Sequence, residues 1–160
     1  MPGHSAPQRS VRGLSKQRLR VWLRMMHATR YLEAAVREGM REALGTTLPR
    51  FDVMAALYRT PSGLTMTALS RALKVSNGNV TGIVERLVKE RLVVRTSNAR
   101  DRRATHVALT KRGRERFAQM AAVHEQWIDE LLGVFEERDC ATLIDLLARV
   151  IPREAEKQGG

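Results

Sequence analysis

The chain contains almost no cysteine. Cys140 is the single cysteine among 160 residues, which excludes an intrachain disulfide and a zinc site built from several cysteines. A lone cysteine near the start of an expected helix could act as a redox sensor. We instead interpret Cys140 as a small buried residue.

Other signatures of catalysis and metal binding are missing as well. The four histidines, His4, His27, His106 and His124, show neither the HxxxH nor the HxxE spacing of zinc ligands. No glycine pair is followed by the Lys and Ser or Thr of a phosphate-binding loop. A Cys140–His124 pair has no supporting signature of a catalytic nucleophile. We therefore predict that the chain is not an enzyme and has no metal or cofactor.

Long apolar runs are also absent. No stretch approaches the roughly 18 apolar residues that a membrane-spanning helix needs, and no signal peptide opens the chain. The sequence therefore predicts a cytoplasmic protein without a membrane partner.

Acidic residues are unevenly distributed along a chain whose formal net charge is +11. The first 32 residues contain no Asp or Glu, and residues 71–116 contain 13 Lys or Arg against 4 Asp or Glu. Residues 124–160 reverse this balance, with 4 basic against 9 acidic residues. This clustering predicts a nucleic-acid partner for the basic part of the chain.

A hairpin expected over residues 92–109 concentrates the positive charge. Residues 92–96 and 105–109 predict two strands, because apolar residues alternate with polar or small ones in the second of them. The loop between the strands contains Arg100, Asp101, Arg102 and Arg103. Such a loop is suited to DNA phosphates or to a minor groove. The hairpin alone could equally be a solvated surface feature.

Residues 65–92 favour the DNA-binding interpretation, because they predict two short helices joined by a tight turn. Thr65 and Ser76 are suitable N-cap residues for these helices, and we expect Val75 to fill the turn. Apolar residues recur in the second helix at three- and four-residue spacing and form one buried face. They are Val80, Ile83, Val84, Leu87 and Val88.

The opposite face of the second helix is small and polar. Asn can read adenine, Thr can contact a thymine methyl group, and Arg can pair with guanine or phosphate. Gly78 and Gly82 each lower helix propensity by roughly 1 kcal/mol relative to Ala, which close approach to DNA or close helix packing would explain equally well. Together with the hairpin, these helices predict a winged helix-turn-helix. The residues expected to bind DNA are Ser76, Asn77, Asn79, Thr81, Arg86, Arg100, Arg102 and Arg103.

The remaining chain predicts long helices on either side of the winged helix, so the fold class is mainly α with a small β-hairpin wing. We expect a disordered basic arm over residues 1–14 and one domain over residues 15–160. Within it, the DNA-binding winged helix would span about residues 48–110, between dimerisation helices at about 16–44 and 111–151. Pro49 would open a helix through Tyr58, and Thr110 and Asp139 would cap the last two helices.

These terminal helices predict a homodimer. The first has two apolar stripes, which suit a helix between two neighbours, and the last two are also apolar along one side. A twofold dimer would place two winged helices about one DNA turn, roughly 34 Å, apart on a pseudo-palindromic operator. The expected subunit contacts are Trp127, Ile128, Leu131, Leu143, Leu147 and the segment 19–23.

The segment LTMTALSRALKVSNGNVTGIVERLVKERLVVRTSNARDRRATHVALTKRG resembles the DNA-binding core of the MarR family of bacterial transcription regulators. The family signature DxRxxxVxLT stands here as Asp101, Arg103, Val107, Leu109 and Thr110, followed by a glycine at 113. The resemblance extends over roughly residues 18–150. The expected recognition helix departs from the family's commonest pattern at positions 78 and 79, where many members carry bulkier or more polar residues.

The resemblance implies a sequence-specific transcription regulator, and we expect a repressor that a small ligand releases from DNA. The run REALGTTLPRFDVMAALYR with VSNGNVTG looks like family members that control aromatic-acid catabolism, so an aromatic acid or its CoA thioester is the expected effector. An accessory or nucleoid-type DNA-binding protein without an effector is the alternative. The expected ligand-binding residues, which could also be plain core, are Trp22, Met26, His27, Arg30, Phe51 and Tyr58.

Overall fold

The computed structural model describes the backbone of residues 6–98 and 101–150 and the side chains of residues 13–96 and 106–150. A long helix, α1 (Ala6–Glu42), is followed by α2 (Leu48–Arg59), the short strand β1 (Leu64–Thr65), α3 (Met66–Leu73) and α4 (Asn77–Lys89). The hairpin β2 (Val93–Asn98) and β3 (Asp101–Leu109) leads into α5 (Lys111–Leu132) and α6 (Glu137–Ala148). The expected fold class, helical with a small β wing, is confirmed.

The sheet has three antiparallel strands in the order β1-β3-β2. Val93 lies opposite Leu109, and Val107 lies between Arg95 of β2 and Leu64 of β1. The buried face of this sheet packs with α2, α4 and the end of α1 into one core. The fully buried side chains are Met40, Met54, Leu57, Leu69, Leu87, Met120, Val53, Val80, Val84, Val93 and Val107.

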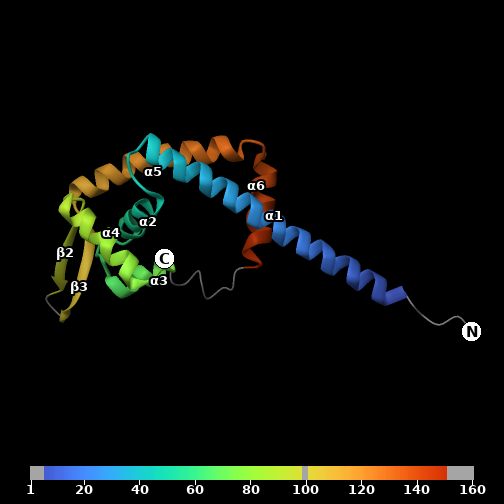
Figure 1. Cartoon of the computed structure of the whole chain (residues 1–160), viewed down its shortest axis with the longest axis horizontal. Coiled ribbons are helices and arrows are strands. Elements are labelled where there is room, and N and C mark those ends of the chain that lie inside the picture. The colour runs from blue at the N-terminus through green and yellow to red at the C-terminus, as the bar shows by residue number, and fades with distance from the viewer. Residues whose placement is uncertain (1–5, 99–100, 151–160) are drawn as a thin grey trace, which may run out of the picture.

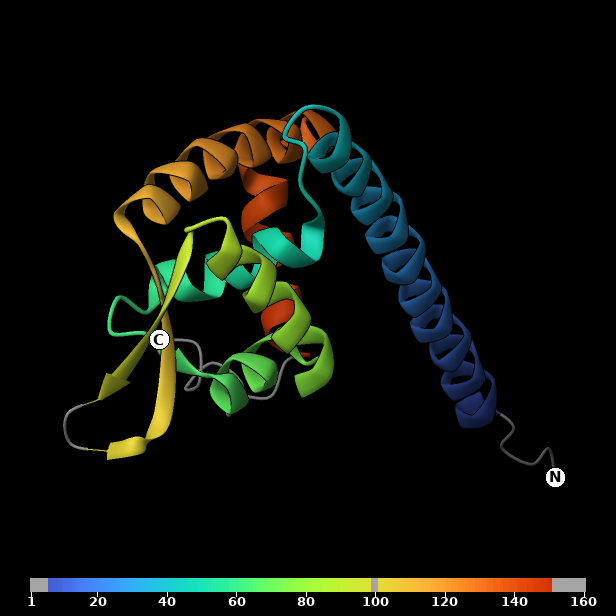
Figure 2. The same ribbon diagram turned by 60° about the vertical axis from the view of Figure 1, so that its left-hand side comes forward.

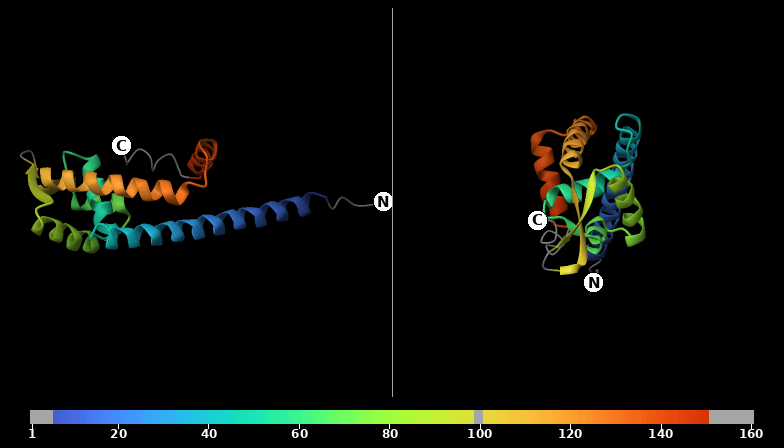
Figure 3. Two further views of the ribbon diagram at one scale, coloured as in Figure 1. Left: turned by 90° about the horizontal axis from the view of Figure 1, so that it is seen from above. Right: turned by 90° about the vertical axis from the view of Figure 1, so that its left-hand side faces the viewer.

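Helix α1 extends far beyond this core. It projects away from the winged helix in Figure 1, and in Figure 3 it continues past the end of α5. Only its last part is buried, at Val36 and Met40, whereas Leu19, Val21 and Trp22 are each more than half exposed. The large apolar residues of α1 between positions 13 and 23 are therefore uncovered by the described part of the chain.

The expected disordered arm over residues 1–14 is wrong for residues 6–14, which belong to α1, while residues 1–5 lie outside the described part of the chain. Pro7 falls in the first helical turn, where its missing N–H has no partner to lose. Gly13 lowers helix propensity but does not end the helix. Proline and glycine content thus gave the wrong start for α1.

The predicted helix caps are partly confirmed. The Thr65 hydroxyl accepts a hydrogen bond from the Ala68 N–H at 3.1 Å, and the Thr110 hydroxyl accepts one from the Gly113 N–H at 2.9 Å. Ser76 occupies the N-cap of α4, although its side chain makes no capping bond. The prediction for α6 is wrong by three residues, because Glu136 is the N-cap and Asp139 bonds back to it in a capping box.

The base of the wing and the start of α5 are in very close contact. The Thr110 hydroxyl donates to the Arg91 carbonyl at 2.8 Å, and the Thr110 N–H donates to the Leu92 carbonyl at 3.0 Å. One turn later, a Cβ at Gly113 would lie 1.9 Å from that Leu92 carbonyl oxygen. The strand β2 and the helix α5 can therefore approach this closely only because residue 113 has no side chain.

No described helix is both long enough and apolar enough to cross a membrane.

Replacing Gly113 with Ala tests this close approach. We expect Gly113→Ala to lower the free energy of unfolding by about 1–3 kcal/mol, because the backbone at Leu92 must move. Gly82→Ala is the matched control, since nothing lies within 4 Å of a Cβ at that helical position. The control should raise stability by up to about 1 kcal/mol. Urea unfolding of both variants measures the difference, and equal stability of the two would contradict the packing at Leu92.

Candidate nucleic-acid interface

Helix α4 is fixed to the core along one side. Val80, Val84 and Leu87 have no exposed surface, and Ile83 and Val88 are partly buried against the same cluster. The predicted apolar face of this helix is confirmed. The helix can expose its opposite face because three consecutive turns are anchored from behind.

The exposed face of α4 carries little side-chain bulk at two positions. Gly78 and Gly82 stand four residues apart and therefore on the same side of the helix, and no atom lies within 4 Å of a Cβ built at either position. Close helix packing, one of the two explanations for these glycines, is thus excluded among the residues that the structure describes. The open face is available for close approach by another molecule.

The polar residues predicted to bind DNA lie at the start and along the outside of α4. Ser76, Asn77, Asn79 and Arg86 are exposed, whereas Thr81 is partly buried. The Thr81 hydroxyl donates to the Asn77 carbonyl oxygen at 2.8 Å, so its proton is already used and its oxygen remains an acceptor. The structure brings these five residues together on one helix.

The turn before α4 differs from expectation. Lys74 adopts a left-handed conformation with φ of 54°, and the Val75 N–H donates to the Ser70 carbonyl at 3.1 Å. Backbone bonds therefore close the turn, and Val75, expected to fill it, keeps 43% of its surface exposed.

The wing places one further cation beside α4. Arg95 of β2 lies 4.0 Å from Glu85 of α4, and both side chains are about half exposed. Strand alternation could have predicted this position, because residues two apart on a strand lie on the same face and Val93 is buried against the core. The predicted wing residues cannot be placed in the same way: Arg100 lies outside the described residues, and so do the side chains of Arg102 and Arg103.

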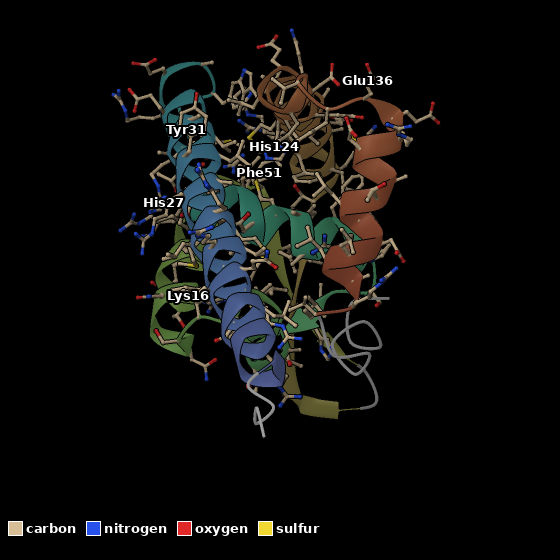
Figure 4. All side chains as sticks on the ribbon, turned by 90° about the vertical axis from the view of Figure 1, so that its right-hand side faces the viewer. Lys16, His27, Tyr31, Phe51, His124 and Glu136 are labelled. Atoms are coloured by element: carbon tan, nitrogen blue, oxygen red, sulfur yellow. The ribbon has the colours of Figure 1, made fainter. Side chains whose placement is uncertain are left out.

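The six predicted ligand-binding residues come from α1 and α2. On α1, Trp22, His27 and Arg30 are exposed and Met26 is partly buried. Phe51 and Tyr58 instead belong to an aromatic cluster on α2 and α5. The Phe51 ring is 5.2 Å from Phe117 and 4.9 Å from His124, and the Tyr58 ring is 4.8 Å from Phe117. Figure 4 shows Phe51 beside His124, with His27 and Tyr31 along α1.

A cavity of about 490 Å³ lies between the end of α1, the start of α2 and the outer side of α4. Its wall is mainly apolar, with one predicted DNA-binding residue among the polar ones. It is lined by Arg37, Thr47, Pro49, Asp52, Leu73, Val75, Asn79 and Ile83. We call it the α1–α4 cavity.

Asp52 has an unusual environment in the wall of the α1–α4 cavity. Although Asp52 is exposed, partial desolvation of its carboxyl group raises the pKa and nearby Glu33 adds to the rise, while His124, Arg37 and Arg59 act in the opposite direction. The cavity therefore holds a carboxyl group whose charge is less favourable than in water.

Cys140 is exposed, so its interpretation as a buried residue is wrong. The reason is that the described part of the chain buries no residue of α6. Among the described residues, no three His, Cys, Asp or Glu side chains are grouped to hold a metal ion.

The geometry defines a winged helix-turn-helix, and comparison with known proteins identifies its family. The sequence profile of the MarR family matches residues 44–104. A crystal structure of a MarR family transcriptional regulator from Silicibacter pomeroyi shares 32% identity and a TM-score of 0.71, covering 85% of this chain and 94% of that one. The chain belongs to the MarR family of transcription regulators.

Two other comparisons extend this result. A mutant of E. coli MarR, crystallised in complex with operator DNA, shares 28% identity and a TM-score of 0.69 over 81% of this chain and 92% of that one. The transcriptional activatory protein BadR of Rhodopseudomonas palustris is 31% identical over 69% of this chain. The chain spans just under two thirds (65%) of the length of that relative.

Proposed function

We propose that this chain is a sequence-specific transcription regulator that reads double-stranded DNA with the exposed face of α4 and with the β2–β3 wing. The open surface around Gly78 and Gly82 carries the proposal, because a side chain there would keep a DNA backbone away. The likeness to E. coli MarR, whose mutant was crystallised in complex with operator DNA, supports DNA as the partner.

Within this surface, Asn77, Asn79, Thr81 and Arg86 contact base edges or the adjacent backbone in the major groove. Ser76, at the N-terminus of α4, offers its hydroxyl and nearby free N–H groups to a phosphate. Arg100, Arg102 and Arg103 supply the wing with phosphate or minor-groove contacts.

We expect Asn79 and Arg102 to affect DNA binding differently. Asn79→Ala should erase the preference for operator over random duplex, because an amide at a base edge supplies sequence information. Arg102→Gln should weaken both complexes and lower the slope of log affinity against log salt by about 0.9 for a lost phosphate contact. Fluorescence anisotropy over a range of salt concentrations measures both effects. Unchanged sequence preference in Asn79→Ala would show that α4 is not the reading helix.

The regulator would act as a homodimer joined through α1 and α6. The exposed apolar residues of these helices have no cover among the residues that the structure describes, and such surface is typical of an interface with another copy. On α1 and α6 they are Leu14, Leu19, Val21, Trp22, Leu23, Tyr31, Leu143, Ile144, Leu146 and Leu147. Trp127, Ile128 and Leu131, also expected at this interface, are partly buried against their own chain, where Trp127 packs on Gly39.

Sedimentation equilibrium at micromolar concentration should give twice the 18.1 kDa mass of the chain. Ile144→Glu should shift that mass toward one chain, because Ile144 is 70% exposed here and would be buried in the dimer. Val134→Glu is a control at another exposed apolar residue, 82% exposed, in the turn before α6. A single-chain mass for the unmodified protein would contradict the dimer.

The proposed effector is a small aromatic acid bound in the α1–α4 cavity. About 490 Å³ is within the usual size of a small-molecule site; in a CoA thioester the acyl group alone would enter. The apolar wall suits an aromatic ring, and Arg37 is the cation beside it. Because Asn79 lines the same cavity, a ligand there would touch the reading helix directly and could release DNA.

Release by about 100-fold requires that the ligand prefer the state not bound to DNA by about 2.7 kcal/mol. By linkage, operator DNA must weaken ligand binding by the same factor. Calorimetric titration of aromatic acids and their CoA thioesters, with and without operator, measures both sides. Ile83→Trp, which fills the cavity wall, should abolish ligand binding. Equal ligand affinity with and without operator would exclude that compound as the effector. If no ligand changes DNA affinity and all DNA sequences bind equally well, the accessory DNA-binding protein is favoured.

A further inference from the structure

A second cavity, of about 430 Å³, lies at the other end of α4. It is lined by Lys89, Glu90, Arg91, Leu92, Arg112 and Arg116. Four of these six residues are cations, and the acid, Glu90, already pairs with Arg50 of α2. The described wall of this basic cavity therefore presents an excess of positive charge to whatever enters it.

The backbone holds these cations in place. Arg91 has a φ of 60°, a left-handed conformation that non-glycine residues seldom adopt, and its carbonyl accepts the Thr110 hydroxyl proton. The Arg116 guanidinium donates to the Leu44 carbonyl at 2.8 Å. Gly113 keeps the start of α5 against Leu92. The two segments that line the cavity, residues 89–92 and the start of α5, are thus held in place.

The start of α5 adds to the positive potential. A helix N-terminus carries a partial positive charge and favours acidic residues in its first turn. The first turn of α5 instead contains Lys111 and Arg112 and no acidic residue. An anion bound beside Arg112 would compensate for both unfavourable features.

This cavity lies at the opposite end of α4 from Asn79, and Arg86 of the proposed DNA surface is less than one helical turn from Lys89. Ten residues of helix separate Asn79 from Lys89, which is about 15 Å along the axis. Figure 2 shows the end of α4, the base of the wing and the start of α5 together on the side opposite the wing tip. A ligand in the basic cavity would therefore not contact the start of α4.

We propose that the basic cavity binds a phosphorylated small molecule, with Lys89 and Arg112 as its principal contacts. Phosphate oxygens accept several hydrogen bonds at once, and arginine binds them in a bidentate fashion. Because the cavity joins α4, the wing and α5, its ligand would bridge the reading helix to the helix that leads toward the dimer interface.

Calorimetric titration of the full chain with sodium pyrophosphate at constant ionic strength tests the proposal. We expect one site per chain, and Arg112→Gln and Lys89→Gln should each weaken binding about five- to tenfold. Lys111→Gln is the matched control, because it removes the same charge from the neighbouring position outside the cavity. It should change the affinity by less than about twofold.

Failure to find saturable binding would overturn the proposal, and so would equal losses in all three variants, which indicate general surface charge. Anisotropy with a random DNA duplex distinguishes the remaining source of phosphate. If Arg112→Gln weakens duplex binding as strongly as it weakens pyrophosphate binding, the cavity belongs to the DNA surface and the proposal is wrong. Unchanged duplex binding, with loss of pyrophosphate binding, supports a separate site and leaves the proposed DNA-binding function intact.

Discussion

The attachment of α4 to the core is the interaction on which the other features depend. Val80, Val84 and Leu87 are fully buried, so their helix cannot rotate without exposing apolar surface worth about 1.5–3 kcal/mol for each side chain. This anchoring determines which residues face outward, and it places Gly78, Gly82 and Arg86 there together. The polar face is thus a consequence of the apolar one.

The same helix lies between two cavities. Asn79, near its first turn, lines the α1–α4 cavity, and Lys89, at its end, lines the basic cavity. Each cavity also includes residues of a helix outside the winged helix, α1 in one case and α5 in the other. A ligand in either position would therefore contact both α4 and one of the long helices, which is the arrangement that coupling between sites requires.

Local patterns in the sequence predicted local structure well. Three patterns predicted structure correctly: the apolar spacing of α4, the caps at Thr65 and Thr110, and the strand alternation. Each depends on neighbours only a few residues apart. The predicted start of α1 was wrong, and so was the predicted burial of Cys140 and Val75. Composition does not show what a segment packs against. The cavities could not be predicted, since they join residues as distant in sequence as Arg37 and Asn79, or Lys89 and Arg112. The wing residues Arg100, Arg102 and Arg103 remain predictions.

Hydroxyl-radical footprinting on operator DNA tests most directly whether the exposed faces of two α4 helices read DNA together. Two protected stretches, with centres about one helical turn or 10 base pairs apart, are expected on one face of the duplex. The Asn79→Ala variant should lose these protections at protein concentrations at which the unmodified chain retains them. A single protected stretch, or uniform weak protection over the whole fragment, would contradict the account.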